Sequence, residues 1–339
     1  MSRAIGWQKV AIDGSVRSIT RHSCSPNLLA AGLRVGDQPL LVDVTHGVAR
    51  GFKGELPNRL HHGLSAVATD GANTFVTEDV DPSHAEPATM QLVDQYLTEV
   101  IDQPRDRRGS KPLWFWPLMD GEEDFRTVGA VRADGRWELH AWQDFGDWVP
   151  MDRGHPLFVS AKPSSRSVLT GSTEAYVIVA GAISDQSGGP DASPQVWTIE
   201  DIGGPRTSGR WTRRPLVPAP DALTDVASWE VGWWVAGHRD LRPVVYDFDS
   251  RDGAGIPMPA TRLDPRHPVV YVAGIPISRS MVLATQSADG PTVWVRSGRN
   301  WLRIPAPAGK LLAAQTSDDG VYVLIDGTLW FRSMPDSGC

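Results

Sequence analysis

Residues 292–305 read TVWVRSGRNWLRIP and hold two tryptophans on either side of a Ser-Gly-Arg-Asn turn. The pattern is a strand through Trp294, a turn, and a second segment that opens at Trp301 and reaches Pro305. The same order recurs at two other pairs of tryptophans, Trp142 with Trp148 and Trp197 with Trp211. A unit that returns in this way predicts a repeat architecture assembled from one supersecondary element.

The two ends of the chain each carry half of this repeated unit. Residues 6–10, GWQKV, contain only the second segment, and residues 328–331, TLWF, contain only the first. Pairing them would complete one more sheet and remove open sheet edges that invite aggregation. The sequence therefore predicts a series of sheets closed by its N-terminal strand.

The spacing of the repeats predicts the number of sheets. The second tryptophan of the unit returns at multiples of about 45 to 47 residues, once an insertion before Trp211 is allowed. We therefore predict an all-β fold, a single-domain β-propeller over residues 1–339 with seven blades, with six or eight as alternatives. The predicted blades span residues 16–57, 60–104, 111–151, 155–218, 221–265, 267–307, and 310–335 together with 4–12.

Short apolar runs separated by Gly, Pro, Asp and Asn fill most of the chain, and many are apolar throughout. Such runs predict strands that are buried on both faces, as in stacked sheets. Residues 88–101 are the exception, because their apolar spacing suits either an amphipathic helix or two short strands. Trp114 and Trp116 alternate on a predicted innermost strand, so both face either the central channel or the core between blades.

The bulk composition excludes several classes of protein. The net charge is −7, which argues against a nucleic-acid partner. The two cysteines, Cys24 and Cys339, predict neither a disulfide framework nor a cysteine zinc site. No apolar run approaches the length of a membrane span or of a signal-peptide core. We therefore expect a cytoplasmic monomer without membrane contact.

Three short Asp-Gly segments resemble a known hairpin. Residues 287–294, SADGPTVW, look like the Asp-box hairpin of sialidase-like propellers, and residues 317–320 and 133–137 are weaker copies. In that hairpin the Asp and Gly cap a tight turn, and the Trp packs beneath it. The resemblance implies a propeller fold only. Sialidase activity is not inferred, because the arginine triad and the Tyr-Glu pair of that family have no counterpart here.

Candidate site residues come from the loops that enter the innermost strands. In propellers these loops share a face with the loops between the second and third strands, and ligands often bind there. Six of the seven predicted entry segments carry Arg, His or Lys. As catalytic residues we predict His62, His155 and His267. As ligand-binding residues we predict Arg17, Lys111, Trp114, Trp116, Asp221, Arg239 and Lys310.

This set of side chains predicts acid–base chemistry on an anionic molecule. Clustered cations attract carboxylates or phosphates, and imidazoles transfer protons near neutral pH. We predict a lyase, isomerase or cyclase that acts on a small polar or anionic organic molecule. The alternative is a non-catalytic propeller that binds a glycan, a peptide or a partner protein. The usual nucleophile, phosphate-loop and dinucleotide motifs are absent, so no cofactor is predicted. Three histidines in alternate blades would lie far apart, so no metal is predicted.

Overall fold

The computed structural model describes residues 6–21, 27–52, 62–69, 73–78, 89–93, 96–101, 114–118, 126–133, 136–143, 147–150, 157–159, 171–172, 175–180, 194–200, 211–229, 232–248, 253–275, 280–318 and 320–334. The chain divides into two compact units. Unit 1 comprises Met1–Asp102 and Ala273–Cys339, and unit 2 comprises Gln103–Val272. The prediction of a single domain stays a prediction.

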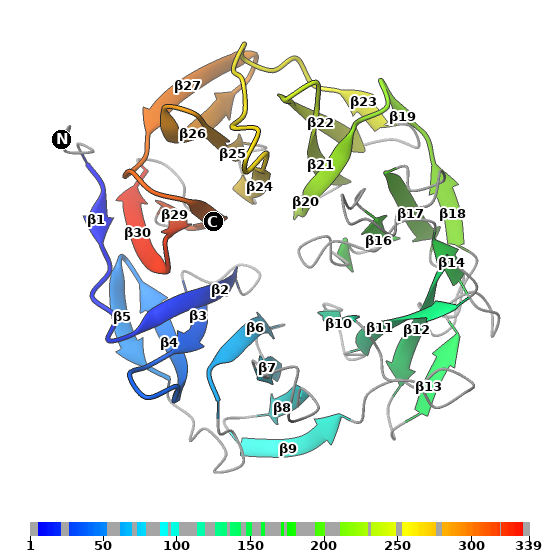
Figure 1. The fold of residues 1–339 in the computed structure, drawn as a ribbon, viewed down its shortest axis with the longest axis vertical. Helices are drawn as coiled ribbons and strands as arrows, with labels where there is room; N and C mark the ends of the chain where they lie inside the picture. The colour runs from blue at the N-terminus through cyan, green and yellow to red at the C-terminus, as the bar shows by residue number, and fades with distance from the viewer. Residues whose placement is uncertain are drawn as a thin grey trace. The chain divides into compact units, whose positions relative to one another are not determined.

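The described residues form strands and turns without helices, and these strands make seven sheets (Figure 1). In unit 1 the strand orders are β2 (Ser15–Arg21), β3 (Leu28–Leu33), β4 (Pro39–Thr45), β5 (Val48–Gly51); β6 (Leu64–Thr69), β7 (Asn73–Glu78), β8 (Thr89–Val93), β9 (Tyr96–Ile101); and β28 (Leu311–Ser317), β29 (Gly320–Ile325), β30 (Thr328–Ser333), β1 (Gln8–Lys9). The sheet β24 (Val270–Ile275), β25 (Ser280–Ser287), β26 (Gly290–Ser297), β27 (Asn300–Pro305) belongs to unit 1 from Ala273 onward.

Unit 2 contains the other three sheets. Their strands are β10 (Trp114–Leu118), β11 (Arg126–Ala133), β12 (Arg136–Gln143), β13 (Asp147–Pro150) with β14 (Leu157–Val159); β15 (Gly171–Ser172), β16 (Ala175–Ala180), β17 (Gln195–Glu200), β18 (Trp211–Arg214); and β20 (Ala222–Trp229), β21 (Gly232–Arg239), β22 (Arg242–Phe248), β23 (Gly253–Gly255) with β19 (Leu216–Val217). Among the described strands of unit 2, those that follow one another along a sheet pair antiparallel, whereas β19 and β23 pair parallel.

The N-terminal strand completes the last sheet, as the half units at the chain ends predict. β1 pairs antiparallel with β30, with Gln8 opposite Phe331 and Lys9 opposite Trp330 (Figure 1). The Val10 N–H extends the pairing to the Leu329 carbonyl at 3.0 Å. The Trp7 indole donates to the Pro305 carbonyl of β27 at 2.9 Å. The start of the chain is therefore hydrogen-bonded to two sheets of unit 1.

Strand β3 explains why many runs are apolar throughout. Successive side chains of a strand point to opposite faces. Leu28 and Ala30 pack with residues of β28–β30, whereas Leu29 and Ala31 pack with Leu64, Val67 and Val76 of the next sheet. All four β3 side chains are at most 6% exposed. Both faces of this sheet are thus buried, as the sequence predicts.

The core of unit 2 follows the same rule. Trp233 of β21 stacks on Phe248 of β22 at a centroid distance of 3.7 Å, and both pack with Val196 and Leu223 from two sheets. Trp234, the next residue, is also buried. The two tryptophans point to opposite faces of β21, so a large aromatic side chain packs on each face of this sheet.

Two details of the predicted blades are settled by strand pairing. Within residues 88–101, Thr89–Val93 forms β8 and Tyr96–Ile101 forms β9, with Val93 opposite Tyr96, so the described part of this segment is two strands. The predicted fourth blade was placed wrongly at its start. β14, which follows position 155, pairs with β12 of the preceding sheet, and the fourth sheet begins at β15. The number of blades and the resemblance to an Asp-box stay predictions.

Candidate functional site

The first strands of four sheets have a buried apolar residue at their first or second position, and a β-bulge follows it. The cross-strand register shifts there, which leaves one extra residue on the first strand. In each of the following pairs the buried residue comes first and the extra residue second: Val16 and Arg17, Leu64 and Ser65, Leu223 and Thr224, and Leu311 and Leu312. A bulge redirects the side chain of its extra residue. In β2 this residue is Arg17, whose side chain is exposed.

Glycines opposite two of these bulges are required by the close approach of the strands. A Cβ atom on Gly32 would lie 1.9 Å from the Ser15 carbonyl oxygen, and one on Gly237 would lie 2.0 Å from that of Ala222. Real Cβ atoms essentially never come within 3.0 Å of such an atom. The bulges of β2 and β20 are therefore encoded by glycine on the neighbouring strand.

Loops between second and third strands contact the segments that enter the next sheet, as expected for one shared face. The Val16 N–H donates to the Gly327 carbonyl at 2.8 Å, and the Leu263 N–H donates to the Leu241 carbonyl at 2.8 Å. His62, just ahead of β6, contacts Asp37 in the β3–β4 turn. The same kind of contact thus occurs in both units.

Asp37 and His62 form the clearest acid–base pair among the described side chains. The His62 Nδ1 atom lies 3.1 Å from the Asp37 Oδ2 atom, and both side chains are about half exposed. The pKa of the Asp37 carboxyl is lowered, chiefly by this hydrogen bond, with smaller contributions from the Gly63 N–H, His62 and Arg17. Asp37 is thus the carboxylate acceptor, so Nδ1 carries the proton and Nε2 is left as the second ring nitrogen.

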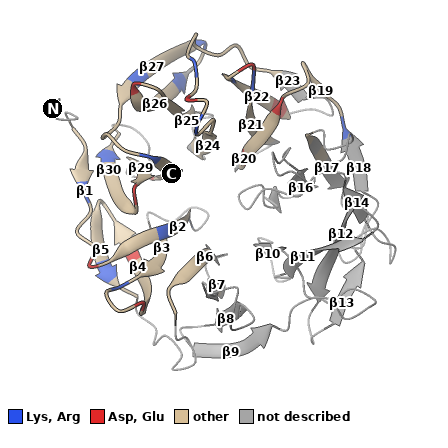
Figure 2. Cartoon of the chain, viewed as in Figure 1, with Lys and Arg blue, Asp and Glu red and all other residues tan. Residues whose placement is uncertain are grey.

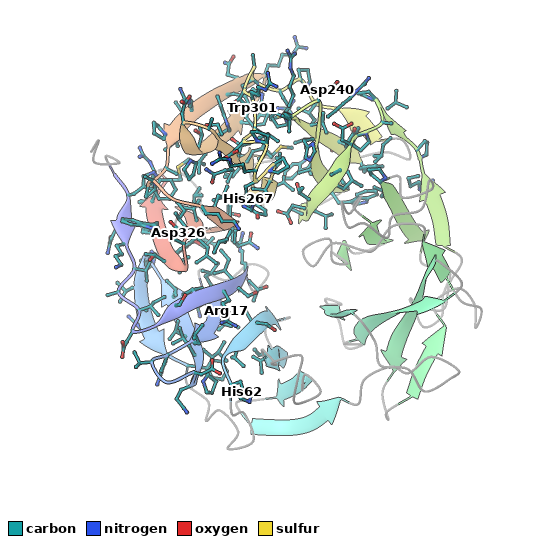
Figure 3. The ribbon with its side chains drawn as sticks, viewed as in Figure 1. Arg17, His62, Asp240, His267, Trp301 and Asp326 are labelled. Carbon is teal, nitrogen blue, oxygen red and sulfur yellow. The ribbon has the colours of Figure 1, made fainter. Side chains whose placement is uncertain are left out.

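Arg17 and Gly63 complete this cluster in unit 1. Arg17 lies on β2 and His62 ahead of β6, as Figure 3 labels them. The positive charge of Arg17 also lowers the pKa of Asp37, as the smallest of the contributions. A Cβ atom on Gly63 would lie 2.6 Å from the Leu33 Cβ atom, so glycine lets the His62 segment approach the β3–β4 turn.

A second pair lies in unit 2, at the entry to β20. The Asp240 N–H donates to Asp221 Oδ2 at 2.6 Å, and the Asp221 N–H donates to the His238 carbonyl at 2.8 Å. The His238 Nδ1 atom is 3.9 Å from Asp221 Oδ2 and has no hydrogen-bond partner. Burial lowers the pKa of His238, and the charge of Asp221 opposes this shift. Arg239 lies 3.8 Å from the Asp240 carboxylate.

His267 lies in the segment that leads from β23 to β24 in unit 2. Its N–H donates to the Asp264 carbonyl at 3.0 Å, and the Arg266 N–H donates to Asp264 Oδ1 at 2.9 Å. Leu263 of this segment contacts the turn that carries Asp240 (His267 and Asp240 are labelled in Figure 3). The backbone of this segment is therefore held by hydrogen bonds at His267 and at Leu263.

Lys310 precedes β28 in unit 1 and contacts a turn of its own sheet. Its N–H donates to Asp326 Oδ1 at 3.0 Å, and the Asp326 N–H returns a bond to the Lys310 carbonyl at 3.0 Å. Asp326 and Gly327 both have positive φ, at 48° and 75°, as a two-residue hairpin turn of type I′ requires. The Lys310 side chain is exposed.

Other predicted residues are less fully described. His155 and Lys111 lie outside the described residues. Trp114 and Trp116 stand opposite Ala130 and Val128 of β11, so they share one face of their sheet, but their side chains lie outside the described part. Of the predicted residues, His62 contacts Asp37 in unit 1, and Asp221 accepts a hydrogen bond from the N–H of Asp240 in unit 2. The ligand and catalytic roles of all ten predicted residues stay predictions.

Asp37 is the residue that the sequence analysis missed. It is 25 positions from His62, and turn residues between strands are polar in most proteins. The available signal was its position in a loop between second and third strands, on the face where the entry segments were expected. With Asp37 present, the cluster can orient an imidazole, attract an anion and transfer a proton.

The described residues contain neither a cluster of metal-ligating side chains nor a membrane-spanning helix. No group of three or more His, Cys, Asp or Glu side chains there is placed to hold a metal ion. Nor does that part of the chain contain a helix with the length and hydropathy of a membrane span.

No family model and no curated protein matches the chain, but solved structures do. BamB from Moraxella catarrhalis is 12% identical, over 98% of this chain and 92% of that chain, with a TM-score of 0.50. A putative 6-phosphogluconolactonase from Bacteroides fragilis is 9% identical, over 88% and 85%, with a TM-score of 0.53. The β-propeller domain of the Trilobed protease from Pyrococcus furiosus is 8% identical, over 92% and 91%, with a TM-score of 0.53. With its succession of four- and five-stranded sheets, in which consecutive strands pair antiparallel, the chain has a β-propeller fold.

Proposed function

We propose that the chain is an enzyme of acid–base type that acts on a small anionic organic molecule at the Arg17–Asp37–His62 cluster. The observation that carries the proposal is the 3.1 Å contact between Asp37 Oδ2 and His62 Nδ1. A carboxylate that accepts from Nδ1 fixes the tautomer and orientation of the ring, so Nε2 can exchange a proton with a substrate. In this proposal Asp37 orients the ring, and His62 transfers the proton.

Arg17 supplies the second element of the proposal. An exposed guanidinium beside an imidazole can bind a carboxylate or phosphate through two parallel hydrogen bonds. An anionic substrate held in this way would present the carbon next to its acidic group to His62. Nε2 would remove the proton from that carbon. In an isomerase the proton returns to another atom of the same molecule, in a lyase it goes to the group that leaves as the double bond forms, and in a cyclase it goes to the group displaced when the ring bond forms. His155 and His267 remain proposed as further proton-transfer groups.

Similar propellers are compatible with this proposal and with its alternative. The Bacteroides protein is described as a putative 6-phosphogluconolactonase, which is an activity on a small anionic molecule. Fold alone does not assign a reaction, because propellers include enzymes and binding proteins. The alternative is a non-catalytic binding propeller, and the exposure of the Asp37–His62 pair to solvent favours it.

The first experiment is a thermal-shift screen with small carboxylates, phosphates and sugars. A ligand at ten times its Kd would stabilise the fold by about 1.4 kcal/mol, or about 2 °C in Tm. The shift should disappear in Arg17→Gln and persist in the control Arg50→Gln, which alters an exposed arginine of β5. A screen in which no compound depends on Arg17 would contradict both binding and catalysis at this cluster.

The second experiment separates catalysis from binding. The selected compound is incubated with protein in D₂O, and proton NMR follows the loss of the signal from the carbon next to its acidic group. His62→Gln should slow this exchange by about 10²- to 10⁴-fold, and Asp37→Asn should slow it less. His46→Asn, in the exposed β4–β5 turn, is the control. Binding without exchange in the unmodified protein would establish the non-catalytic alternative instead.

A further inference from the structure

The hairpin of β26 and β27 has a charge opposite to that of the whole chain. Residues 290–310 contain four cations, Arg296, Arg299, Arg303 and Lys310, and no Asp or Glu. The chain as a whole carries a net charge of −7. Figure 2 marks Lys and Arg on β26 and β27, and both strands belong to unit 1.

Arginine and tryptophan alternate on one face of this hairpin. Trp294 stands opposite Arg303, and Arg296 stands opposite Trp301. The Arg303 Cζ atom is 5.9 Å from the centre of the Trp294 ring, and the Arg296 Cζ atom is 6.0 Å from that of Trp301. We call Arg296, Arg303, Trp294 and Trp301 the basic hairpin face. A guanidinium that lies over an indole keeps its N–H edges available for an anion.

The arginines of this hairpin have no acidic partner in the part of the chain that the structure describes. Among the described residues, no carboxylate forms an ion pair with Arg296, Arg299 or Arg303. Arg21 of the same unit, by contrast, is paired with Asp318. Arg296 uses its Nε–H to bind the Gly298 carbonyl at 3.0 Å, which fixes its position. Several cations held on one hairpin without carboxylates attract an external anion.

The dimensions of the face suit an extended chain. β27 is the end strand of its sheet, and the Trp7 indole donates to the carbonyl of Pro305 at the end of this strand. Diagonal neighbours on paired strands are about 7 to 8 Å apart, which is the relation of Arg296 to Arg303. Alternate side chains of an extended peptide are about 6.6 Å apart. Two acidic side chains at positions i and i+2 would therefore meet the two guanidinium groups.

We propose that the basic hairpin face binds an extended acidic segment of a partner protein. Carboxylates match the planar fork of arginine, and the partly exposed Trp301 offers apolar contact beside them. The strand is about 20 Å long, which is roughly two Debye lengths at physiological salt. A nucleic acid would extend past the hairpin and meet the negative charge of the rest of the chain, whereas a short peptide would not.

The probe is a fluorescein-labelled octapeptide of alternating Glu and Thr, with binding followed by fluorescence anisotropy at about 20 mM salt. The double variant Arg296→Gln/Arg303→Gln should raise its Kd at least about tenfold. The matched control Arg50→Gln/Arg262→Gln removes the same two charges from exposed positions elsewhere. Its Kd should stay within about twofold of that of the unmodified protein, and unchanged circular dichroism and Tm confirm that each variant is folded.

Three results would overturn the proposal. One is an equal loss in both double variants, which would mean that net charge alone governs binding. Another is the absence of measurable binding at about 1 mM peptide. The third is tighter binding of an oligothymidine of the same length, which would assign the face to single-stranded nucleic acid. His62→Gln should leave peptide binding unchanged, so failure of this proposal is distinguishable from failure of the proposed enzyme activity.

Discussion

Substituting Gly32 by Ala tests the bulge that presents Arg17. The new Cβ atom would lie 1.9 Å from the Ser15 carbonyl oxygen, so β2 and β3 must separate by about 1 Å to reach the 3.0 Å limit. Ladder hydrogen bonds of about 2.9 Å would then stretch to about 3.9 Å and be lost. Val16 is 1% exposed and would lose part of its burial. Together with the loss of two such hydrogen bonds, this should lower the free energy of unfolding by about 3 to 5 kcal/mol. This is a large fraction of the stability of an ordinary domain.

The measurement is urea denaturation of Gly32→Ala beside a matched control, Gly51→Ala. Gly51 ends β5, and a Cβ atom there would meet nothing within 4 Å. Alanine at Gly51 should leave the midpoint unchanged or raise it slightly, because it lowers the entropy of the unfolded chain. Equal midpoints for the two variants would refute the steric argument. Gly237→Ala should reproduce the loss at the matching bulge of unit 2.

Three further predictions concern an ion pair, a turn and a buried histidine. Asp318→Asn leaves the buried Arg21 without its carboxylate and should lower the free energy of unfolding by about 3 kcal/mol in urea denaturation, whereas the exposed Asp289→Asn should change it by less than about 0.5 kcal/mol. Leu241 has a φ of 57°, which costs a residue of its kind about 1 kcal/mol, so Leu241→Gly should raise Tm by about 2 °C; a fall would show that its packing matters more. Burial lowers the pKa of His238, so the unfolded state binds more protons as pH falls below about 6.5, and stability is lost there. His238→Gln should therefore lose less Tm than the unmodified protein between about pH 7.5 and about pH 5, and equal losses would contradict this reasoning.

Local patterns in the sequence identify much of the fold. The tryptophans at matching positions of the repeat predict the pairing of the N-terminal strand with the last sheet, and β1 pairs with β30 as expected. Runs such as residues 28–31 predict burial on both faces, because no polar residue interrupts them. Residues 88–101 have an apolar spacing that two strands satisfy as well as a helix does, so only their pairing with β7 distinguishes the two.

Long-range pairing is what the sequence could not supply. β14 is three residues long and pairs with β12 of the preceding sheet, and nothing in its composition selects that partner over the next sheet. The same limit applies to the candidate site. His62 and Arg17 were identified from their places before or within first strands, whereas Asp37 joins them through a contact between two loops. Its acidity alone did not distinguish it from the other polar turn residues.

The hydrogen bond between Trp7 and Pro305 spans 298 residues, and the ion pair between Arg21 and Asp318 spans 297. During synthesis at about 5 to 20 residues per second, the opening strand must wait on the order of half a minute before its partners leave the ribosome. In that interval β30 has not been synthesised, so β1 has no strand to pair with and Arg21 of β2 has no carboxylate partner. Chaperones that shield exposed strands would therefore matter most for this protein before translation ends.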